Sequence, residues 1–212
     1  MEDIQRIAEQ AHQDFEARTL ARDKALTISR QLTRNAAHAI RAIHRSEHEL
    51  AHQYLDQCQQ LYGSMLLELD GYPDLYFTGY TQDAAKEYCE ALITCAIIEN
   101  QPLPEPQPLK LEQVTFLRGL SETPGELRRR CLDILRQGYS DEAERLLDAM
   151  DEIYNVLVTM DYPDAITFGL RRQTDLVRGI VERTRGDLTI SIREEKLKMA
   201  LDKAQRHFPL PE

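Results

Sequence analysis

Glycine and proline are scarce in this sequence. Nine glycines and nine prolines make up about 8.5% of the 212 residues, against roughly 12% in an average protein. This composition excludes collagen-like and low-complexity chains, and it favours long, uninterrupted helices. The apolar content of 42% excludes disorder as the main state and is sufficient for one compact domain over residues 1–212.

Cysteine is also scarce, and no apolar run is long enough to cross a membrane. The four cysteines Cys58, Cys89, Cys95 and Cys131 show no CxxC spacing, so we expect neither a disulfide framework nor a zinc ribbon. The amino terminus is charged and lacks the apolar region of a signal peptide. We therefore expect a soluble protein of a reducing compartment, the cytoplasm, with no membrane partner.

Apolar residues recur at helical spacing over most of the chain, and no segment of any length alternates with period two. The predicted fold class is therefore all-α. Helices are expected over residues 4–45, 48–69, 82–99, 111–137, 141–160 and 165–207. Four prolines within Gln101–Pro108 predict an extended connector between the third and fourth helices.

Caps and helix breakers refine these boundaries. Thr81 and Ser140 are candidate N-caps of the third and fifth helices, each with acidic residues in the first turn. Gly138 is expected to end the fourth helix. Pro124 predicts an interruption and a bend within that helix, and Gly186 predicts a break in the last one.

The charge is unevenly distributed along the chain. A formal net charge of −10 argues against a general nucleic-acid binder only if the charge is spread evenly. Residues 139–164 carry eight acids and one arginine, whereas no acid lies between Lys24 and Ser46. On a helix, one side of the latter segment is basic and the side roughly 200° away is apolar, with Leu32, Ala36, Ala39 and Ile43. The basic face consists of Arg30, Arg34, His38, Arg41 and Arg45.

Two interpretations of the basic face remain open. It is either a solvated surface with ion pairs to neighbouring helices, or a surface whose arginines contact the phosphates of a nucleic acid. The second interpretation explains how an acidic protein can still bind nucleic acid, particularly if the arginines line an interior cavity.

Two pairs of glutamates have a spacing suited to metal ligation. Glu87 and Glu90 lie at i and i+3, and Glu122 and Glu126 lie at i and i+4, so each pair presents its carboxylates on one side of a helix. Like charges at these spacings repel each other. Mg²⁺ or Mn²⁺ would offset this repulsion, because hard cations prefer oxygen ligands from facing helices.

A second metal hypothesis concerns histidines, and several enzyme classes lack support. His44, His48 and His52 lie at i, i+4 and i+8, a spacing that places three imidazoles on one helix face for a transition metal. No GxGxxG, GxxxxGK[ST], HExxH or GxSxG motif occurs, so dinucleotide binding, P-loop chemistry, zincin proteolysis and serine hydrolysis have no support. A cysteine nucleophile is equally unsupported.

Several segments, in this order and spacing, carry a family resemblance. They are Lys86-Glu-Tyr-Cys-Glu-Ala, Gly119-Leu-Ser-Glu-Thr-Pro-Gly-Glu-Leu-Arg-Arg, Asp161-Tyr-Pro-Asp-Ala-Ile-Thr with Gly169-Leu-Arg-Arg, Asp175-Leu-Val-Arg, and Glu182-Arg-Thr-Arg-Gly-Asp-Leu-Thr. Together they resemble the translin and translin-associated factor X (TRAX) family, especially its archaeal-type members. The resemblance covers nearly the whole chain, including the basic first helix.

The resemblance implies a translin-like all-α fold of about seven helices, with long first and last helices in an antiparallel bundle. It also implies a hollow homo-oligomer, an octamer, that encloses single-stranded RNA, with ssDNA as a further ligand. TRAX-like members are Mg²⁺-dependent endoribonucleases, and carrying over their acidic residues places Glu87, Glu90, Glu122 and Glu126 in the catalytic metal site. Glu122 departs from the aspartate of the catalytic branch, and Pro124 is a local change beside it.

Two other functions are compatible with these residues. A translin-like protein binds nucleic acid without cutting it, in which case the carboxylates are structural. An all-α nucleotide pyrophosphatase of the MazG or dUTPase-like kind also holds Mg²⁺ on paired acidic helix motifs. Its second motif is usually ExxD, whereas this chain has ExxxE, and a pyrophosphatase has no use for a long row of arginines.

Overall fold

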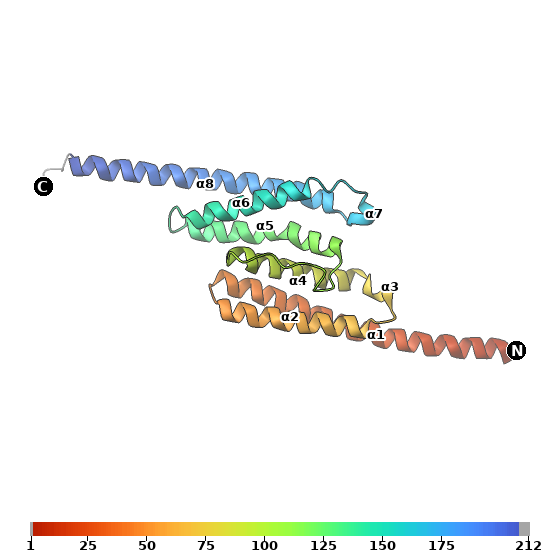
Figure 1. The fold of residues 1–212 in the computed structure, drawn as a ribbon. Coiled ribbons are helices and arrows are strands. Elements are labelled where there is room, and N and C mark those ends of the chain that lie inside the picture. Colours follow the sequence, from red (N-terminus) through yellow and green to blue (C-terminus); the bar gives the residue numbers. More distant parts are fainter. Residues whose placement is uncertain (1, 208–212) are drawn as a thin grey trace. The chain divides into compact units, whose positions relative to one another are not determined.

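The structure, a computed structural model, describes residues 2–207 (Figure 1). These residues form eight α-helices and no strand, which confirms the predicted all-α class. The chain divides into two compact units. Within the described residues, one unit comprises the chain up to Cys95 together with Pro104–Gly119, and the other comprises Ala96–Leu103 and the chain from Leu120 onward.

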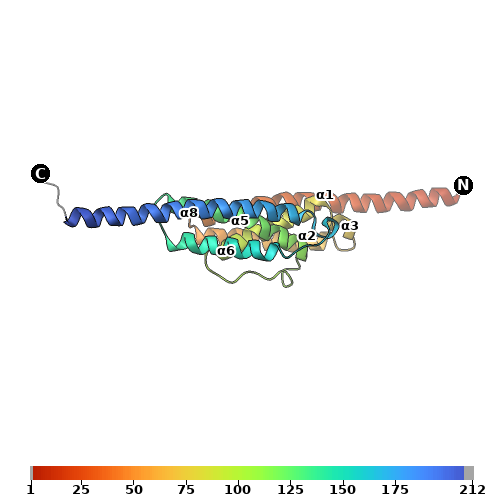
Figure 2. The same ribbon diagram turned by 90° about the horizontal axis from the view of Figure 1, so that it is seen from above.

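The first unit is built on two long antiparallel helices. Helix α1 spans Glu2–His44 and α2 spans His48–Glu68, close to the predicted ranges, and they lie side by side (Figures 1 and 2). A tight turn with Ser46 at φ 59° joins them. Small side chains on α1 allow the helices to approach each other closely. The buried residues are Ala21, Ala25, Ser29, Leu32, Ala36, Ala39, Ile40, Ala42 and Ile43 on α1, and Ala51, Leu55, Cys58, Tyr62 and Met65 on α2.

Helix α4 begins earlier than its predicted cap. A short helix α3, Pro73–Tyr76, precedes α4, which spans Gly79–Ile98. The prediction of Thr81 as N-cap is therefore wrong. The carbonyl oxygen of Thr78 accepts the amide of Gln82 at 3.1 Å, and the Thr81 hydroxyl, fully buried inside the helix, donates to the Leu75 carbonyl at 3.2 Å.

The proline-rich connector is non-helical, as predicted, and is held against α2. The Tyr62 hydroxyl of α2 donates a hydrogen bond to the Lys110 carbonyl at 2.9 Å. Helix α5 then spans Gln113–Leu135 and is continuous through Pro124, so the predicted interruption is wrong. Proline removes one backbone hydrogen bond, but the buried side chains of Thr123 and Leu127 on either side hold the helix through packing.

The second unit contains three further helices. They are α6, Asp141–Leu157, α7, Asp164–Thr167, and α8, Leu170–His207, and α6 packs along α8 (Figure 2). Ser140 is the N-cap of α6, as predicted, and its hydroxyl accepts the amide of Glu142 at 3.2 Å. The amphipathic face of α6 buries Ala143, Leu146, Leu147, Met150, Ile153 and Leu157.

The predicted break near Gly186 is wrong. Helix α8 runs straight through this position, and the chain instead turns at Phe168 and Gly169, with φ of 49° and 85°. A glycine inside a helix costs only about 1 kcal/mol. Near Gly186, Arg128 of α5 contacts Thr184 at 3.0 Å and Asp187 at 2.8 Å.

The first half of α1 and the second half of α8 have exposed apolar side chains. They are Ile4, Ile7, Phe15 and Leu20 on α1, and Ile190, Leu197, Met199 and Leu201 on α8, each more than half exposed. Among the described residues, no helix combines the length and the apolar character needed to span a membrane.

Candidate metal centre and basic helix face

A glycine brings helices α4 and α5 into close contact. A Cβ atom placed on Gly119 would lie 2.5 Å from the Cys89 Cβ, 2.9 Å from the Lys86 carbonyl oxygen and 3.0 Å from the Glu90 amide nitrogen. Only a residue without a side chain fits this approach. Because Glu122 follows one turn further along α5, the close contact brings its side chain toward Glu87 and Glu90 on α4.

Substitution of Gly119 by alanine is expected to destabilise the protein by about 1–3 kcal/mol, because the added methyl group meets backbone atoms that cannot move aside. Urea unfolding followed by circular dichroism measures the effect. Gly125→Ala is the matched control, since Gly125 lies on the same helix with nothing within 4 Å of its added Cβ. The control is expected to be neutral or stabilising by up to about 1 kcal/mol, and equal losses in both variants would contradict the packing argument.

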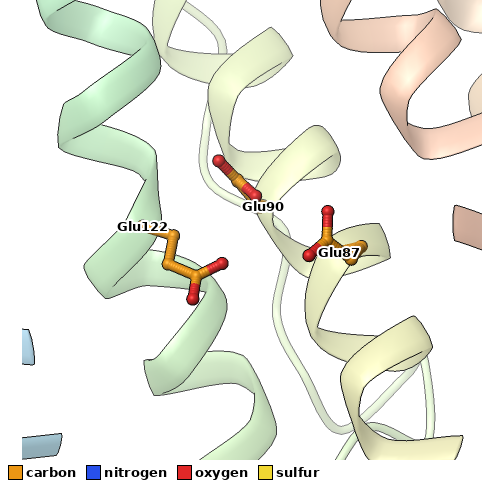
Figure 3. Close-up of side chains that lie close together, drawn as sticks. All are labelled: Glu87, Glu90 and Glu122. Atoms are coloured by element: carbon orange, nitrogen blue, oxygen red, sulfur yellow. The ribbon is translucent and has the colours of Figure 1, made fainter. Parts of the chain in front are cut away.

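Three of the four predicted carboxylates meet at one point. Glu87, Glu90 and Glu122 each offer a carboxylate oxygen, and these oxygens lie within 4.8 Å of one another (Figure 3). We call these three residues the acidic cluster. All three side chains are half-buried. It is the only group of three or more metal-ligating side chains of this kind among residues 2–207.

The fourth predicted carboxylate, Glu126, lies outside the acidic cluster. It follows Glu122 by one turn of α5, and its carboxylate lies 3.6 Å from the guanidinium of Arg129. Its role as a metal ligand stays a prediction.

Lys86, which was not predicted as a site residue, lies beside the acidic cluster. The ammonium of Lys86 is 3.1 Å from a carboxylate oxygen of Glu87, and its side chain is only 11% exposed. A buried ammonium is stable only next to a negative charge. Lys86 directly precedes Glu87 in the sequence, but neighbouring positions on a helix point in different directions, so adjacency alone gave no signal of this contact.

The donor set fits a hard divalent cation. Mg²⁺ binds oxygen ligands at 2.0–2.1 Å, so two ligands of one ion lie at most about 4.2 Å apart. The oxygens of the acidic cluster, within 4.8 Å of one another, need to move by less than about an ångström to reach that geometry. Three half-buried carboxylates placed this close together repel one another, and a divalent cation would reduce that repulsion.

The predicted basic face lies on α1 except for Arg45, which follows the last residue of the helix, His44, so the prediction that all five residues lie on one helix is wrong for Arg45. The arginines of this face are exposed to solvent. Arg30, Arg34, Arg41 and Arg45 are exposed and His38 is half-buried, whereas Leu32, Ala36, Ala39 and Ile43 on the opposite side are buried. Arg45 pairs with Glu47 at 2.7 Å, and Arg41 contacts the His38 imidazole at 3.1 Å. Within residues 2–207, Arg30, Arg34 and Arg41 make no salt bridge. An exposed, solvated face is compatible with these contacts, and the contact of its arginines with phosphates stays a prediction.

The three histidines of the second metal hypothesis do not share one continuous helix. His44 is the last residue of α1, whereas His48 and His52 lie in α2 after the turn. The three imidazoles therefore do not follow one helix face, and the predicted arrangement is wrong.

The cysteines lack the properties of nucleophiles. All four are buried and free. Burial raises the pKa of Cys58 and Cys89 to about 12 and that of Cys131 to about 11. These three thiols are therefore protonated at neutral pH, and the thiolate is the reactive form.

Known proteins resemble this chain in sequence and structure. No family model matches it. An uncharacterised protein of Methanocaldococcus jannaschii, MJ0175, is 31% identical over 187 residues, which cover 87% of this chain and 82% of that protein. The structure of AfC3PO, an Archaeoglobus protein, in complex with duplex RNA matches with a TM-score of 0.81 at 29% identity, covering 88% of this chain and 97% of that one.

Two further solved structures give the same architecture. A crystal structure of AfC3PO matches with a TM-score of 0.81 at 28% identity, again over 88% and 97% of the two chains. Apo-NeC3PO, from Nematostella, matches with a TM-score of 0.79 at 20% identity, over 87% of this chain and 96% of that one. The likeness to the Nematostella protein concerns the fold alone.

Proposed function

Because the chain belongs to the translin and TRAX family, we propose that it binds RNA and cleaves it in a reaction that depends on Mg²⁺ or Mn²⁺. One observation carries the catalytic part of this proposal. Three carboxylates from two helices converge within 4.8 Å of one another, and carboxylate oxygens are the ligands that Mg²⁺ and Mn²⁺ prefer.

The basic face supports the RNA-binding part. Arginine binds phosphate with several donors at once, and Arg30, Arg34 and Arg41 are exposed and make no salt bridge within the described residues. The AfC3PO relative is solved with duplex RNA. In this proposal the basic face contacts the RNA backbone and contributes little to sequence preference.

The chemistry of cleavage follows from the charges at the acidic cluster. When bound, Mg²⁺ lowers the pKa of a water ligand and offsets the charge that develops on the phosphate. Glu87, Glu90 and Glu122 hold the cation, and a carboxylate orients the attacking water or accepts its proton. Lys86 holds the Glu87 carboxylate in place through its contact at 3.1 Å, and it adds positive charge where a phosphate would approach.

One incubation separates the candidate functions. Labelled single-stranded RNA and dNTPs are incubated with the protein, each with Mg²⁺ or with EDTA. We expect shorter RNA in Mg²⁺, intact but retarded RNA in EDTA, and unchanged dNTPs. Intact, retarded RNA in both conditions would assign the chain to the non-catalytic translin-like function. Hydrolysed dNTPs with intact RNA would assign it to the pyrophosphatases.

We also propose that the protein forms a homo-oligomer, an octamer in line with its family resemblance. The exposed apolar residues of α1 and α8, among them Phe15 at 63% and Leu197 at 61% exposure, provide surface for contacts between copies. Exposed apolar side chains of this kind can form contacts between copies of a soluble protein. Light scattering coupled to size-exclusion chromatography measures the mass, and a monomer of 24.5 kDa would contradict this part.

A further inference from the structure

An open groove on the α1–α2 pair lies beside the basic face. It has a volume of about 420 Å³ and is lined by Gln31, Arg34, Asn35, Gln57, Gln60, Leu61 and Ser64. Arg34 thus belongs to both the groove and the basic face. The other lining side chains are neutral, and no carboxylate lines the groove.

Four carboxamides give the groove its chemistry. Gln31, Gln57 and Gln60 are exposed and Asn35 is half-buried. Within residues 2–207, none of these four side chains donates or accepts a hydrogen bond with another protein group. A ligand can therefore use their donors and acceptors without breaking bonds inside the protein. Each carboxamide offers a donor and an acceptor side by side. A nucleobase edge can use both, whereas a phosphate can use only the donor.

An aromatic pair lies on the same two helices as the groove. The His38 ring of α1 stacks on the Tyr54 ring of α2, with centroids 5.0 Å apart and planes inclined by 19°. His38 lies one turn beyond Arg34, and Tyr54 lies one turn before Gln57. An arginine, several carboxamides and a pair of stacked rings on one helix pair are suited to binding unpaired RNA. The bases of unpaired RNA hydrogen-bond along their edges and stack on aromatic rings.

We propose that this groove binds bases of an unpaired RNA strand through the carboxamides of Gln31, Asn35, Gln57 and Gln60, while Arg34 contacts the adjoining phosphate. The inference rests on the proposed RNA binding and extends it from backbone contact to base contact. Adenine is the favoured base, because a carboxamide pairs with its N6 amine and N7 acceptor at once.

The test compares two ligands of equal charge in EDTA, where the RNA stays intact. One is an A15 RNA, and the other is a 15-unit sugar-phosphate strand without bases. We expect the protein to bind A15 at least about tenfold more tightly, and we expect Gln57→Leu with Gln60→Leu to remove most of this difference. Affinity for the base-free strand and the salt dependence of binding should stay unchanged, because neither residue contacts phosphate.

Gln59→Leu is the matched control. Gln59 is an exposed glutamine of the same helix that lines a different groove, beside Tyr88 and Pro108, so its substitution should leave both affinities unchanged. Equal affinity of the wild type for A15 and the base-free strand would overturn the inference while leaving RNA binding intact. An equal loss for both strands in the Gln57/Gln60 variant would overturn it as well. Failure of the wild type to bind either strand would instead overturn the proposed function.

Discussion

Replacement of Glu122 by glutamine is expected to reduce metal-dependent RNA cleavage at least about 100-fold while changing RNA affinity in EDTA less than about twofold. Glutamine keeps the shape of the side chain and removes its charge. A bound divalent cation contributes several kcal/mol to transition-state stabilisation, and each 1.36 kcal/mol corresponds to a factor of ten in rate. Single-turnover cleavage of a labelled RNA, with Mn²⁺ affinity measured in parallel, reports both effects.

Asp133→Asn is the matched control for this experiment. Asp133 also lies on α5, but it is exposed and 3.9 Å from its partner Arg136, so the substitution removes an equal charge far from the acidic cluster. Unchanged cleavage and unchanged Mn²⁺ affinity in Glu122→Gln would remove Glu122 from the metal site.

Glu126→Gln tests the fourth predicted ligand in the same assay. A loss as large as that of Glu122→Gln would assign Glu126 to the cation, and unchanged cleavage would leave it as the partner of Arg129.

The helices were predictable where their signals are local. The bounds of α1 and α2 agree with the prediction within two residues, because apolar periodicity and the tight turn are both visible in the sequence. Pro124 and Gly186 misled the prediction for the opposite reason. Both residues lie in helices that pack against residues distant in sequence, as Arg128 of α5 does with Asp187 of α8 at 2.8 Å, and such contacts are not encoded in a local pattern.

The acidic cluster was predictable in part. The pairing of Glu87 with Glu90 follows from helical spacing alone, whereas the addition of Glu122 depends on how closely two helices approach. Gly119 sets that approach, and its signal was present in the sequence as a small residue one turn before Glu122. Whether Glu122 or Glu126 joins the acidic cluster depends on the rotation of α5 about its axis, and the spacing of residues in the sequence does not determine this rotation.

The groove on the α1–α2 pair could not be predicted from the sequence. Gln31 and Gln57 lie 26 positions apart, and they line the same groove only because α1 and α2 pack as an antiparallel pair with one particular alignment. The basic face needed less information of this kind, since all of its residues except Arg45 belong to one helix. Single-helix surfaces are therefore visible in a sequence, and surfaces shared by two helices become visible only with the fold.

Reversal of two charges on the basic face, Arg34→Glu with Arg41→Glu, is expected to weaken RNA binding at least about 100-fold at low salt. Each arginine that contacts phosphate releases counterions, so the loss of two should lower the slope of log affinity against log salt by about 1.4 for a single strand. Both side chains are exposed on α1, so the fold should be retained, and circular dichroism verifies this. Titration of a labelled RNA in EDTA at several salt concentrations gives the affinity and the slope together.

A second double variant separates local contact from overall charge. Lys196→Glu with Lys198→Glu changes the net charge by the same amount on an exposed part of α8. A general electrostatic effect would weaken RNA binding equally in both variants, because long-range repulsion depends on total charge. A local contact predicts a large loss and a flatter salt slope only in the α1 variant. Equal affinities and equal slopes in the α1 variant and the wild type would leave the arginines as solvated side chains without a role in binding RNA.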